Sequence, residues 1–223
     1  MIKIFQNLVN LFLKSNCALC QRSTPQELCP YCTKQLQSCH LENPGYLWKQ
    51  TLPIFVWGNY NGSVKRAIAA MKYENQPQIA NIFGNWLGQT WLLNQPQETL
   101  KEKLIVIPIP MHSKKQKERG FNQAELIAKS FCNITGLKLN SQILERSKET
   151  QAQFSLSFSE RQKNLADAFT VNPKYQRSCN KPVLLIDDIY TTGATAKAAV
   201  KILEENHIKV IGLAAVAAPI KQK

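Results

Sequence analysis

The chain has 223 residues, of which 28 are lysine or arginine and 15 are aspartate or glutamate, so that its formal net charge is +13. Apolar residues make up 44% of the chain, which excludes an intrinsically disordered protein and allows one α/β core plus a small appendage. The basic excess indicates polyanionic partners, either phosphorylated small molecules or nucleic acid, although a solvated basic surface is the simpler explanation for most of the charge.

The first 14 residues, MIKIFQNLVNLFLK, carry apolar side chains at helical spacing and predict a short helix that packs against the next domain. The segment is too short and too interrupted to span a membrane, and no cleavage site of a signal peptide follows it. We therefore expect a cytoplasmic protein, in which thiols stay reduced and cysteines serve as metal ligands or buried thiols.

Four cysteines follow in the pattern C-x2-C-x8-C-x2-C, and they are Cys17, Cys20, Cys29 and Cys32. Four thiolates favour Zn2+ or an iron–sulfur centre and leave no position for a catalytic water, so the pattern predicts a structural zinc site. Cys39 and His40 could replace a ligand, and redox-sensitive or buried thiols are the alternative. We expect residues 1–45 to form a helix and a metal-dependent zinc module, and residues 46–223 to form the main domain.

Strand and helix patterns follow one another in the next part of the chain. Residues 52–60 predict a strand, and residues 64–71 and 78–93 predict helices with one apolar side each. A second buried strand is expected at residues 104–109, where prolines end the ladder. The pattern assigns no role to Lys72, which ends the first of these helices.

A cluster of basic residues occupies the loop after the second strand and precedes a helix over residues 124–131. Cations at this position would neutralise a pyrophosphate group, and an arginine would do so with two hydrogen bonds. An exposed basic loop is the alternative, because lysine-rich loops are common on soluble proteins. The cluster consists of Lys114, Lys115, Lys117 and Arg119.

A strand, two carboxylates and a hydroxyl-rich loop follow one another in VLLIDDIYTTGAT, residues 183–195. The apolar run predicts a strand buried on both faces of a parallel sheet, and Asp187 and Asp188 lie at its carboxyl end, where ligands of such sheets bind. The loop leads into a helix that begins near Ala194 or Thr195. Its N–H groups and hydroxyls would hold a phosphate, whereas the carboxylates would bind ribose hydroxyls or a hydrated Mg2+. The stretch predicts a ribose 5-phosphate site, the alternative being an acidic pair that caps a turn.

This stretch resembles the signature of type I phosphoribosyltransferases, which bind 5-phosphoribosyl 1-pyrophosphate (PRPP) through an acidic pair and a TTG-type loop. The resemblance implies an α/β fold, a parallel sheet flanked by helices, in which Asp187 and Asp188 bind the ribose hydroxyls and the metal. Lys114 and Arg119 are expected to face the pyrophosphate, and the candidate catalytic residues are Asp187, Asp188 and Arg119. The loop expected to wrap the 5-phosphate consists of Thr191, Thr192, Gly193, Ala194 and Thr195.

The ordered motifs along almost the whole chain resemble the ComF family of competence and DNA-utilisation proteins. They comprise the cysteine pairs, VKRAIAAMKY, VIPIPMHSKKQKERGFNQAELIA, a polar pattern and VLLIDDIYTTGAT. The resemblance implies a zinc-finger-like element joined to a phosphoribosyltransferase-type domain, with a part in the uptake of transforming DNA. Ser113 and Lys114 depart from the family, which often has a proline-containing turn there. The RGFNQ motif is matched by Arg119, Gly120, Phe121, Asn122 and Gln123, and the polar pattern by Arg146, Thr150, Gln153, Arg161 and Asn164.

Two functions agree with this resemblance. In the first, the protein is a phosphoribosyltransferase that uses PRPP with Mg2+ and an acceptor that the sequence does not identify. In the second, it is a non-enzymatic PRPP sensor or an adaptor that binds single-stranded DNA or a competence helicase. Both include Zn2+ in the cysteine module and no membrane span, and both leave the oligomeric state open.

Overall fold

The computed structural model describes residues 15–100, 102–147, 168–175 and 181–220. The helix predicted in the first 14 residues lies outside this part of the chain. So do four residues of the predicted polar pattern, Thr150, Gln153, Arg161 and Asn164. Among the described residues, no helix combines the length and the apolar composition that crossing a membrane requires.

A five-stranded sheet forms the centre of the molecule, and all of its strands run parallel. The strand order is β3 (Ile54–Asn59), β9 (Val210–Ala218), β8 (Val183–Ile189), β4 (Ile105–Pro108) and β5 (Lys138–Leu139). Parallel strands end at the same edge of a sheet, so the segments that follow β4 and β8 lie beside each other. The two acids of β8 therefore lie at the middle of the carboxyl edge.

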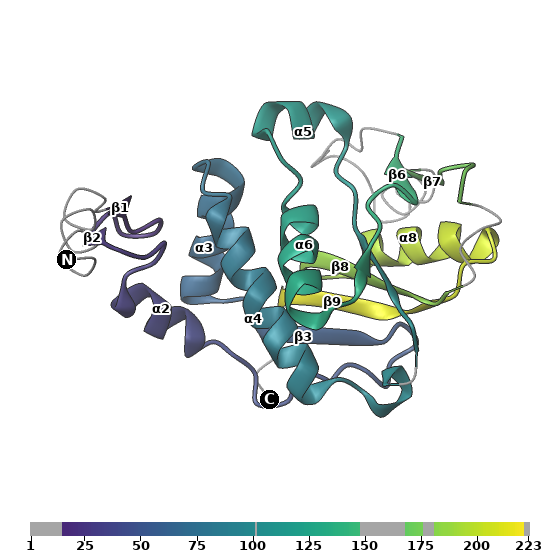
Figure 1. Cartoon of the computed structure of the whole chain (residues 1–223), viewed down its shortest axis with the longest axis horizontal. Coiled ribbons are helices and arrows are strands. Elements are labelled where there is room, and N and C mark those ends of the chain that lie inside the picture. Colours follow the sequence, from purple (N-terminus) through teal and green to yellow (C-terminus); the bar gives the residue numbers. More distant parts are fainter. Residues whose placement is uncertain (1–14, 101, 148–167, 176–180, 221–223) are drawn as a thin grey trace, which may run out of the picture.

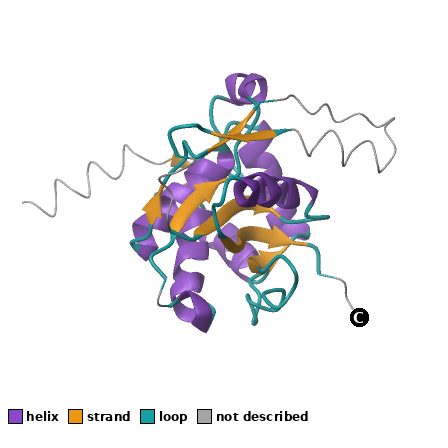
Figure 2. Cartoon of the chain, turned by 90° about the vertical axis from the view of Figure 1, so that its right-hand side faces the viewer, coloured by secondary structure: helices purple, strands orange, loops and turns teal. Residues whose placement is uncertain are grey.

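Helices cover both faces of this sheet, as Figures 1 and 2 show. Alternate residues of β8 point to opposite faces of the sheet. Leu184 and Ile186 belong to one buried cluster, and Val183 and Leu185 belong to the other. The first cluster contains α3 (Gly62–Tyr73), α4 (Gln78–Asn94) and α6 (Gln123–Thr135). The second contains α8 (Ala194–Glu205) and the antiparallel pair β6 (Leu144–Arg146) and β7 (Phe169–Val171). The predicted fold class, a parallel sheet flanked by helices, is confirmed.

The aromatic residues of β3 and α4 lie in the core. Trp57, Phe83 and Trp91 are almost fully buried, and their rings meet other aromatic rings at centroid distances of 5.0 to 6.0 Å. Such edge-to-face contacts stabilise an interior, so these three rings belong to the core. A short 3-10 turn, η1 (Gln97–Thr99), then leads from α4 toward β4.

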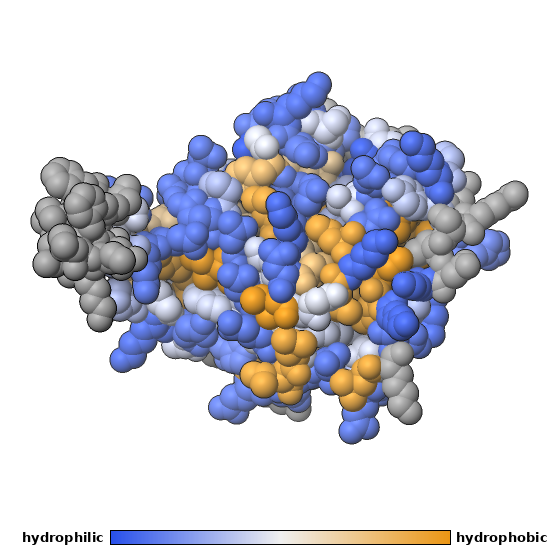
Figure 3. All heavy atoms as spheres, in the orientation of Figure 1, coloured by the Kyte–Doolittle hydropathy of each residue, from blue (hydrophilic) through white to orange (hydrophobic). Residues whose placement is uncertain are grey.

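The predicted basic loop is instead a short helix, α5 (Ser113–Arg119). Both ends of the helix are capped. The His112 side chain accepts a hydrogen bond from the Lys114 N–H at 3.3 Å, and Gly120 ends the helix with a φ of 85°. None of its residues is buried, and the hydrophilic side chains at the top of Figure 3 belong to this part of the molecule. A helix without an apolar face gives no periodic signal, which explains why the sequence predicts a loop there.

The cysteine segment forms a small module beside α3 at one end of the molecule (Figure 1). It consists of β1 (Ser15–Asn16), β2 (Ser23–Thr24) and α2 (Pro30–Gln37). The Arg66 guanidinium donates a hydrogen bond to the Leu19 carbonyl, and Leu36 of α2 belongs to the same buried cluster as Phe55 of the sheet. The boundary between residues 45 and 46 stays a prediction, since the module and the sheet share one core.

Candidate functional site

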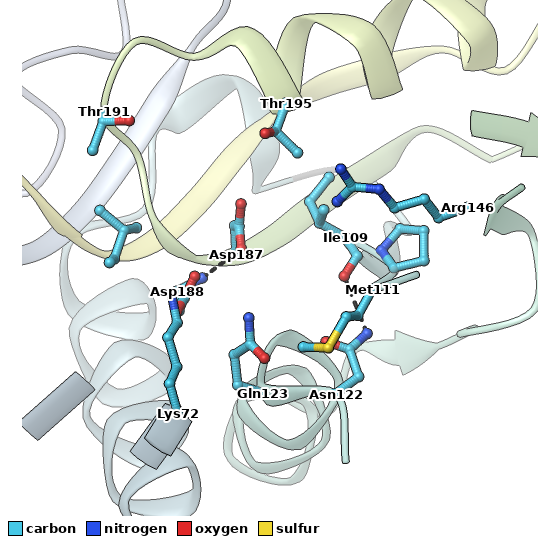
Figure 4. Close-up of a pocket in the computed structure, with 12 residues that line it drawn as sticks. Lys72, Ile109, Met111, Asn122, Gln123, Arg146, Asp187, Asp188, Thr191 and Thr195 are labelled. Atoms are coloured by element: carbon cyan, nitrogen blue, oxygen red, sulfur yellow. Dashed lines mark hydrogen bonds and ion pairs between the residues drawn. The ribbon is translucent and has the colours of Figure 1, made fainter. Parts of the chain in front are cut away.

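A cavity of about 290 Å³ opens at the carboxyl edge of the sheet. Five segments that are distant in the sequence surround it: the end of α3, the residues after β4, the start of α6, β6, and the end of β8 with its following loop (Figure 4). The polar side chains that line it are those of Lys72, Asn122, Gln123, Arg146, Asp187, Asp188, Thr191 and Thr195. Their charges and hydroxyl groups suit a small polar ligand better than an apolar one.

The two carboxylates are held in different ways. Asp187 is half-buried, and its Oδ1 accepts a hydrogen bond from the Asp188 N–H at 2.8 Å. Asp188 is 4% exposed, and its Oδ2 lies 2.5 Å from Nζ of Lys72. Burial raises the pKa of Asp187 well above its usual range, and the negative charge of Asp188 adds to this rise. A cation or a set of hydroxyl donors at this pair would favour the ionised carboxylates and lower that pKa again.

Sequence reasoning misses the role of Lys72. The structure places this lysine in the cavity, near the C-terminal end of α3. Arg146 also lines the cavity, on the side of β6, and burial lowers the pKa of its guanidinium below its ordinary value. The sequence assigns Arg146 only to the polar pattern of the family, and no local signal points either residue at the acids.

The threonine loop lies between the acids and α8, as predicted. Gly193 has a φ of 73° and immediately precedes the helix, which begins at Ala194. A small hollow beneath the loop is lined by all five predicted residues, Thr191, Thr192, Gly193, Ala194 and Thr195. A helix N-terminus with threonine hydroxyls beside it offers neutral hydrogen-bond donors to an anion.

Replacing Gly193 with alanine is expected to destabilise the protein more than the same change at Gly136. Both glycines have a left-handed φ, 73° and 72°, which costs an alanine about 1 kcal/mol. A Cβ at Gly193 would also lie 2.8 Å from the ring of Tyr190, whereas a Cβ at Gly136 would meet nothing within 4 Å. Thermal unfolding of the two variants measures the difference, and equal midpoints would contradict a tight contact between the loop and Tyr190.

Two residues of the RGFNQ motif, Asn122 and Gln123, line the cavity. Asn122 donates to the Ile109 carbonyl at 3.1 Å and accepts from the Ala124 N–H at 3.1 Å, which ties the start of α6 to the end of β4. Gln123 lines the cavity and accepts a hydrogen bond from the Arg119 guanidinium at 2.5 Å. Arg119 also lies over the ring of Tyr73, with its Cζ 5.7 Å from the ring centroid.

The structure brings together part of the predicted PRPP site. Asp187, Asp188, Thr191 and Thr195 line one cavity, and the rest of the threonine loop adjoins it. Arg119 and Lys114 belong to α5 and are not among the described residues that line the cavity, although Arg119 reaches it through Gln123. Their predicted contacts with pyrophosphate, and the catalytic roles of Arg119 and the two acids, stay predictions.

The four predicted cysteines form a second site. Their Sγ atoms all lie within 4.8 Å of one another, and those of Cys20 and Cys29 are 3.6 Å apart. Thiolates around one tetrahedral ion with metal–sulfur bonds of about 2.3 Å would lie about 3.8 Å apart, so the arrangement fits such an ion. Burial opposes ionisation of Cys17, but the N–H groups of Cys29, Leu19 and Cys20 lower the pKa of its thiol to about 6.

The two alternative ligands lie outside this cluster. His40 Nε2 lies 3.1 Å from Oγ1 of Thr90, and its ring packs against Trp57. Burial lowers the pKa of His40, which favours the neutral ring at this contact. The Cys39 thiol donates to the Gln35 carbonyl at 3.5 Å. The choice of the first four cysteines is therefore confirmed as the group that could hold a metal ion.

Comparison with known proteins gives relatives along most of the chain. No family model matches it. Competence protein F of Haemophilus influenzae is 28% identical over 218 residues, covering 92% of this chain and 93% of that protein. The DNA utilization protein YhgH of Salmonella typhimurium is 26% identical over 200 residues, covering 85% of this chain and 84% of the relative. These relatives support the resemblance of the chain to the ComF family. A third relative, competence protein ComFC of Bacillus subtilis, is 28% identical over 149 residues, which cover 66% of this chain and 55% of that protein.

Solved structures similar to this chain include two phosphoribosyltransferases. Adenine phosphoribosyltransferase from Leishmania tarentolae is 13% identical, with a TM-score of 0.39 over 68% of this chain and 74% of that one. Hypoxanthine phosphoribosyltransferase from Staphylococcus aureus is 15% identical, with a TM-score of 0.35 over 63% of this chain and 62% of that one. These scores are low, and the fold class follows from the strand order and the helices of the chain itself.

Proposed function

We propose that this chain is a ComF-family protein that binds PRPP with Mg2+ in the cavity at the carboxyl edge of its sheet and supports the handling of transforming DNA. One observation carries the proposal: β8 leads two carboxylates into a cavity whose next wall is a threonine loop at the start of α8. An acidic pair and a neutral anion cradle side by side suit a ligand with both vicinal hydroxyls and a phosphate.

Each part of the ligand has a matching part of the site. The N–H groups and hydroxyls between Thr191 and Thr195 would hold the 5-phosphate, and the two acids would accept hydrogen bonds from the ribose hydroxyls. Carboxylate oxygens are the ligands that Mg2+ prefers in proteins, and the cavity has room for the water molecules it retains. Mg2+ would neutralise charge on the pyrophosphate, and Arg119 and Lys114 of α5 would approach that group from the rim.

Replacing both acids with asparagine is expected to weaken PRPP binding in the presence of Mg2+ at least about tenfold, because each acid would lose a charge-assisted contact. Titration calorimetry with and without Mg2+ measures the affinity of the variant Asp187→Asn plus Asp188→Asn. A matched control is Glu204→Gln plus Glu205→Gln, which removes the same charge from exposed positions of α8. Unchanged PRPP affinity in the acid variant would contradict this location of the site.

Catalysis is the second part of the proposal. PRPP would react with a nucleophile at its anomeric carbon and release pyrophosphate, with the acids stabilising the positive charge that develops on the sugar. A screen for pyrophosphate release across nucleobases and other candidate acceptors tests this step. Binding of PRPP without release for any acceptor favours the alternative, a non-enzymatic PRPP sensor or adaptor for single-stranded DNA or a competence helicase.

The basic helix α5 favours that alternative, since it carries four cations and buries none of its residues. A nucleic acid bound there would lie at the rim of the PRPP cavity, and its affinity would fall steeply with added salt. The proposal also includes Zn2+ as the structural ion of the four cysteines and the cytoplasm as the compartment that keeps them reduced.

A further inference from the structure

An ion pair joins two walls of the cavity. Lys72 lies near the C-terminal end of α3, and its Nζ is 2.5 Å from Oδ2 of Asp188 at the end of β8. The lysine side chain is 19% exposed and the aspartate side chain 6%, so the pair is mostly shielded from water. Shielding strengthens the attraction between the two charges and leaves either one poorly compensated when the other is removed.

The ion pair occupies one oxygen of Asp188, the Oδ2 atom, which could otherwise contact a metal ion. In Figure 4 the Lys72 side chain extends from α3 to Asp188, while Thr191 and Thr195 lie on the opposite side of the acids. Asp187 Oδ1 is held by the Asp188 N–H at 2.8 Å and so stays at the strand end. Two cations cannot both contact one carboxylate oxygen without strong repulsion. A divalent cation that uses Asp188 Oδ2 would therefore compete with the ammonium group of Lys72.

We propose, on the basis of the proposed PRPP site, that Lys72 is a resident counter-ion of the acidic pair. It neutralises Asp188 while no metal is bound, competes with the divalent cation for this carboxylate, and turns to the pyrophosphate of the ligand when metal and PRPP enter together. The lysine thereby disfavours binding of the metal alone and favours binding of the metal with its anionic ligand.

The position of Lys72 allows this exchange. A lysine carries its charge on a flexible four-carbon stem, so the ammonium group can move several ångströms without a change in the backbone. The next residue, Tyr73, is 79% exposed and carries the Arg119 guanidinium over its ring. The end of α3 thus lies at the open rim, beside Arg119 at the end of α5. An ammonium group that leaves Asp188 therefore stays among groups that would meet an anion.

The test uses the full chain and two titrations of Lys72→Met, which keeps the apolar stem and removes the charge. Binding of Mn2+ alone, followed by the electron paramagnetic resonance signal of the free ion, is expected to become about tenfold tighter. Binding of PRPP with Mg2+, measured by calorimetry, is expected to become about tenfold weaker. A lysine with only a structural role would not change these two affinities in opposite directions.

Two further variants serve as controls. Lys65→Met removes a charge from an exposed position of the same helix and should change neither affinity. Lys72→Arg keeps the positive charge and should bind Mn2+ as weakly as the wild-type protein does. If Lys72→Met does not fold, Lys72→Gln takes its place in both titrations. Unchanged or weaker Mn2+ binding would overturn the counter-ion role even where the wild-type protein binds PRPP. Failure of the wild type to bind PRPP would instead overturn the proposed function, and the Mn2+ titration would still decide whether Lys72 competes with a metal.

Discussion

Replacing Gly84 with alanine is expected to lower the free energy of unfolding by about 2–3 kcal/mol, even though alanine favours a helix over glycine by about 1 kcal/mol. Gly84 lies in the middle of α4, where this helix crosses α6. A Cβ there would lie 2.4 Å from the Ile127 carbonyl oxygen and 2.7 Å from Cβ of Ser130. Because the nearest atom belongs to the backbone of α6, the clash is relieved only when the two helices move apart.

The close approach continues along the same face of α4. A Cβ at Gly88, one turn further along, would lie 2.9 Å from Cβ of Ile134. Separation of the helices would loosen the buried side chains between them and the sheet, among them Phe83 and Phe131. Protein interiors are packed too closely to absorb such a shift without loss of contacts.

Urea unfolding of the Gly84→Ala variant measures this effect. Gly45→Ala is the control, because its Cβ would have no neighbour closer than 3.8 Å, and a surface change of this kind is expected to alter stability by less than about 0.5 kcal/mol. Equal unfolding midpoints for the two variants would mean that the helices separate without cost, contrary to the packing described above.

The sequence predicts the acidic strand and its loop well because their signals are local. Residues 183–195 contain, in order, a run of apolar residues, two acids, a glycine and the start of a helical pattern. The structure predicted for each of these segments connects directly to the structure predicted for the next. The four cysteines are equally local, since their spacing alone brings two pairs of thiols together. These parts of the two candidate sites are the ones that the structure places as expected.

The missed features depend on contacts between distant parts of the chain. Lys72 and Asp188 meet only because the ends of α3 and β8 reach the same cavity, and nothing near either residue signals the other. Arg146 enters that cavity from β6, which pairs with β7 across a segment that lies outside the described residues. Pairings of this kind depend on the tertiary structure and leave no periodic pattern.

Strand β9 is missed for a related reason. Its sequence, VIGLAAVAA, contains four alanines, which have a low preference for strands. The structure places it between β3 and β8 with seven of its nine residues buried. Small side chains at a central position let helices on both faces approach the sheet closely, so tertiary packing outweighs local preference there.

Removal of the metal from the cysteine cluster is expected to unfold the module that β1, β2 and α2 form. The module is shaped by hydrogen bonds such as that from the Ala18 N–H to the Glu27 carbonyl at 3.0 Å. A segment so small buries little apolar surface, whereas a structural Zn2+ contributes about 10–16 kcal/mol of apparent binding free energy at neutral pH. The metal would therefore supply most of the free energy that folds the module.

The variant Cys29→Ser tests this expectation, because Cys29 is buried and its thiol lies 3.6 Å from that of Cys20. Elemental analysis of the purified wild-type protein should find about one zinc per chain, and the variant should have lost most of it. Limited proteolysis should then cut the variant within residues 15–37.

Cys39→Ser is the matched control, since Cys39 lies just after α2 but outside the cluster. This variant should keep its metal and its resistance to proteolysis. A metal-free wild-type protein whose module resists proteolysis would refute a structural role for the ion. Loss of structure that spread to the sheet would show instead that the core shared by Leu36 and Phe55 couples the two parts, which bears on the predicted boundary at residue 45.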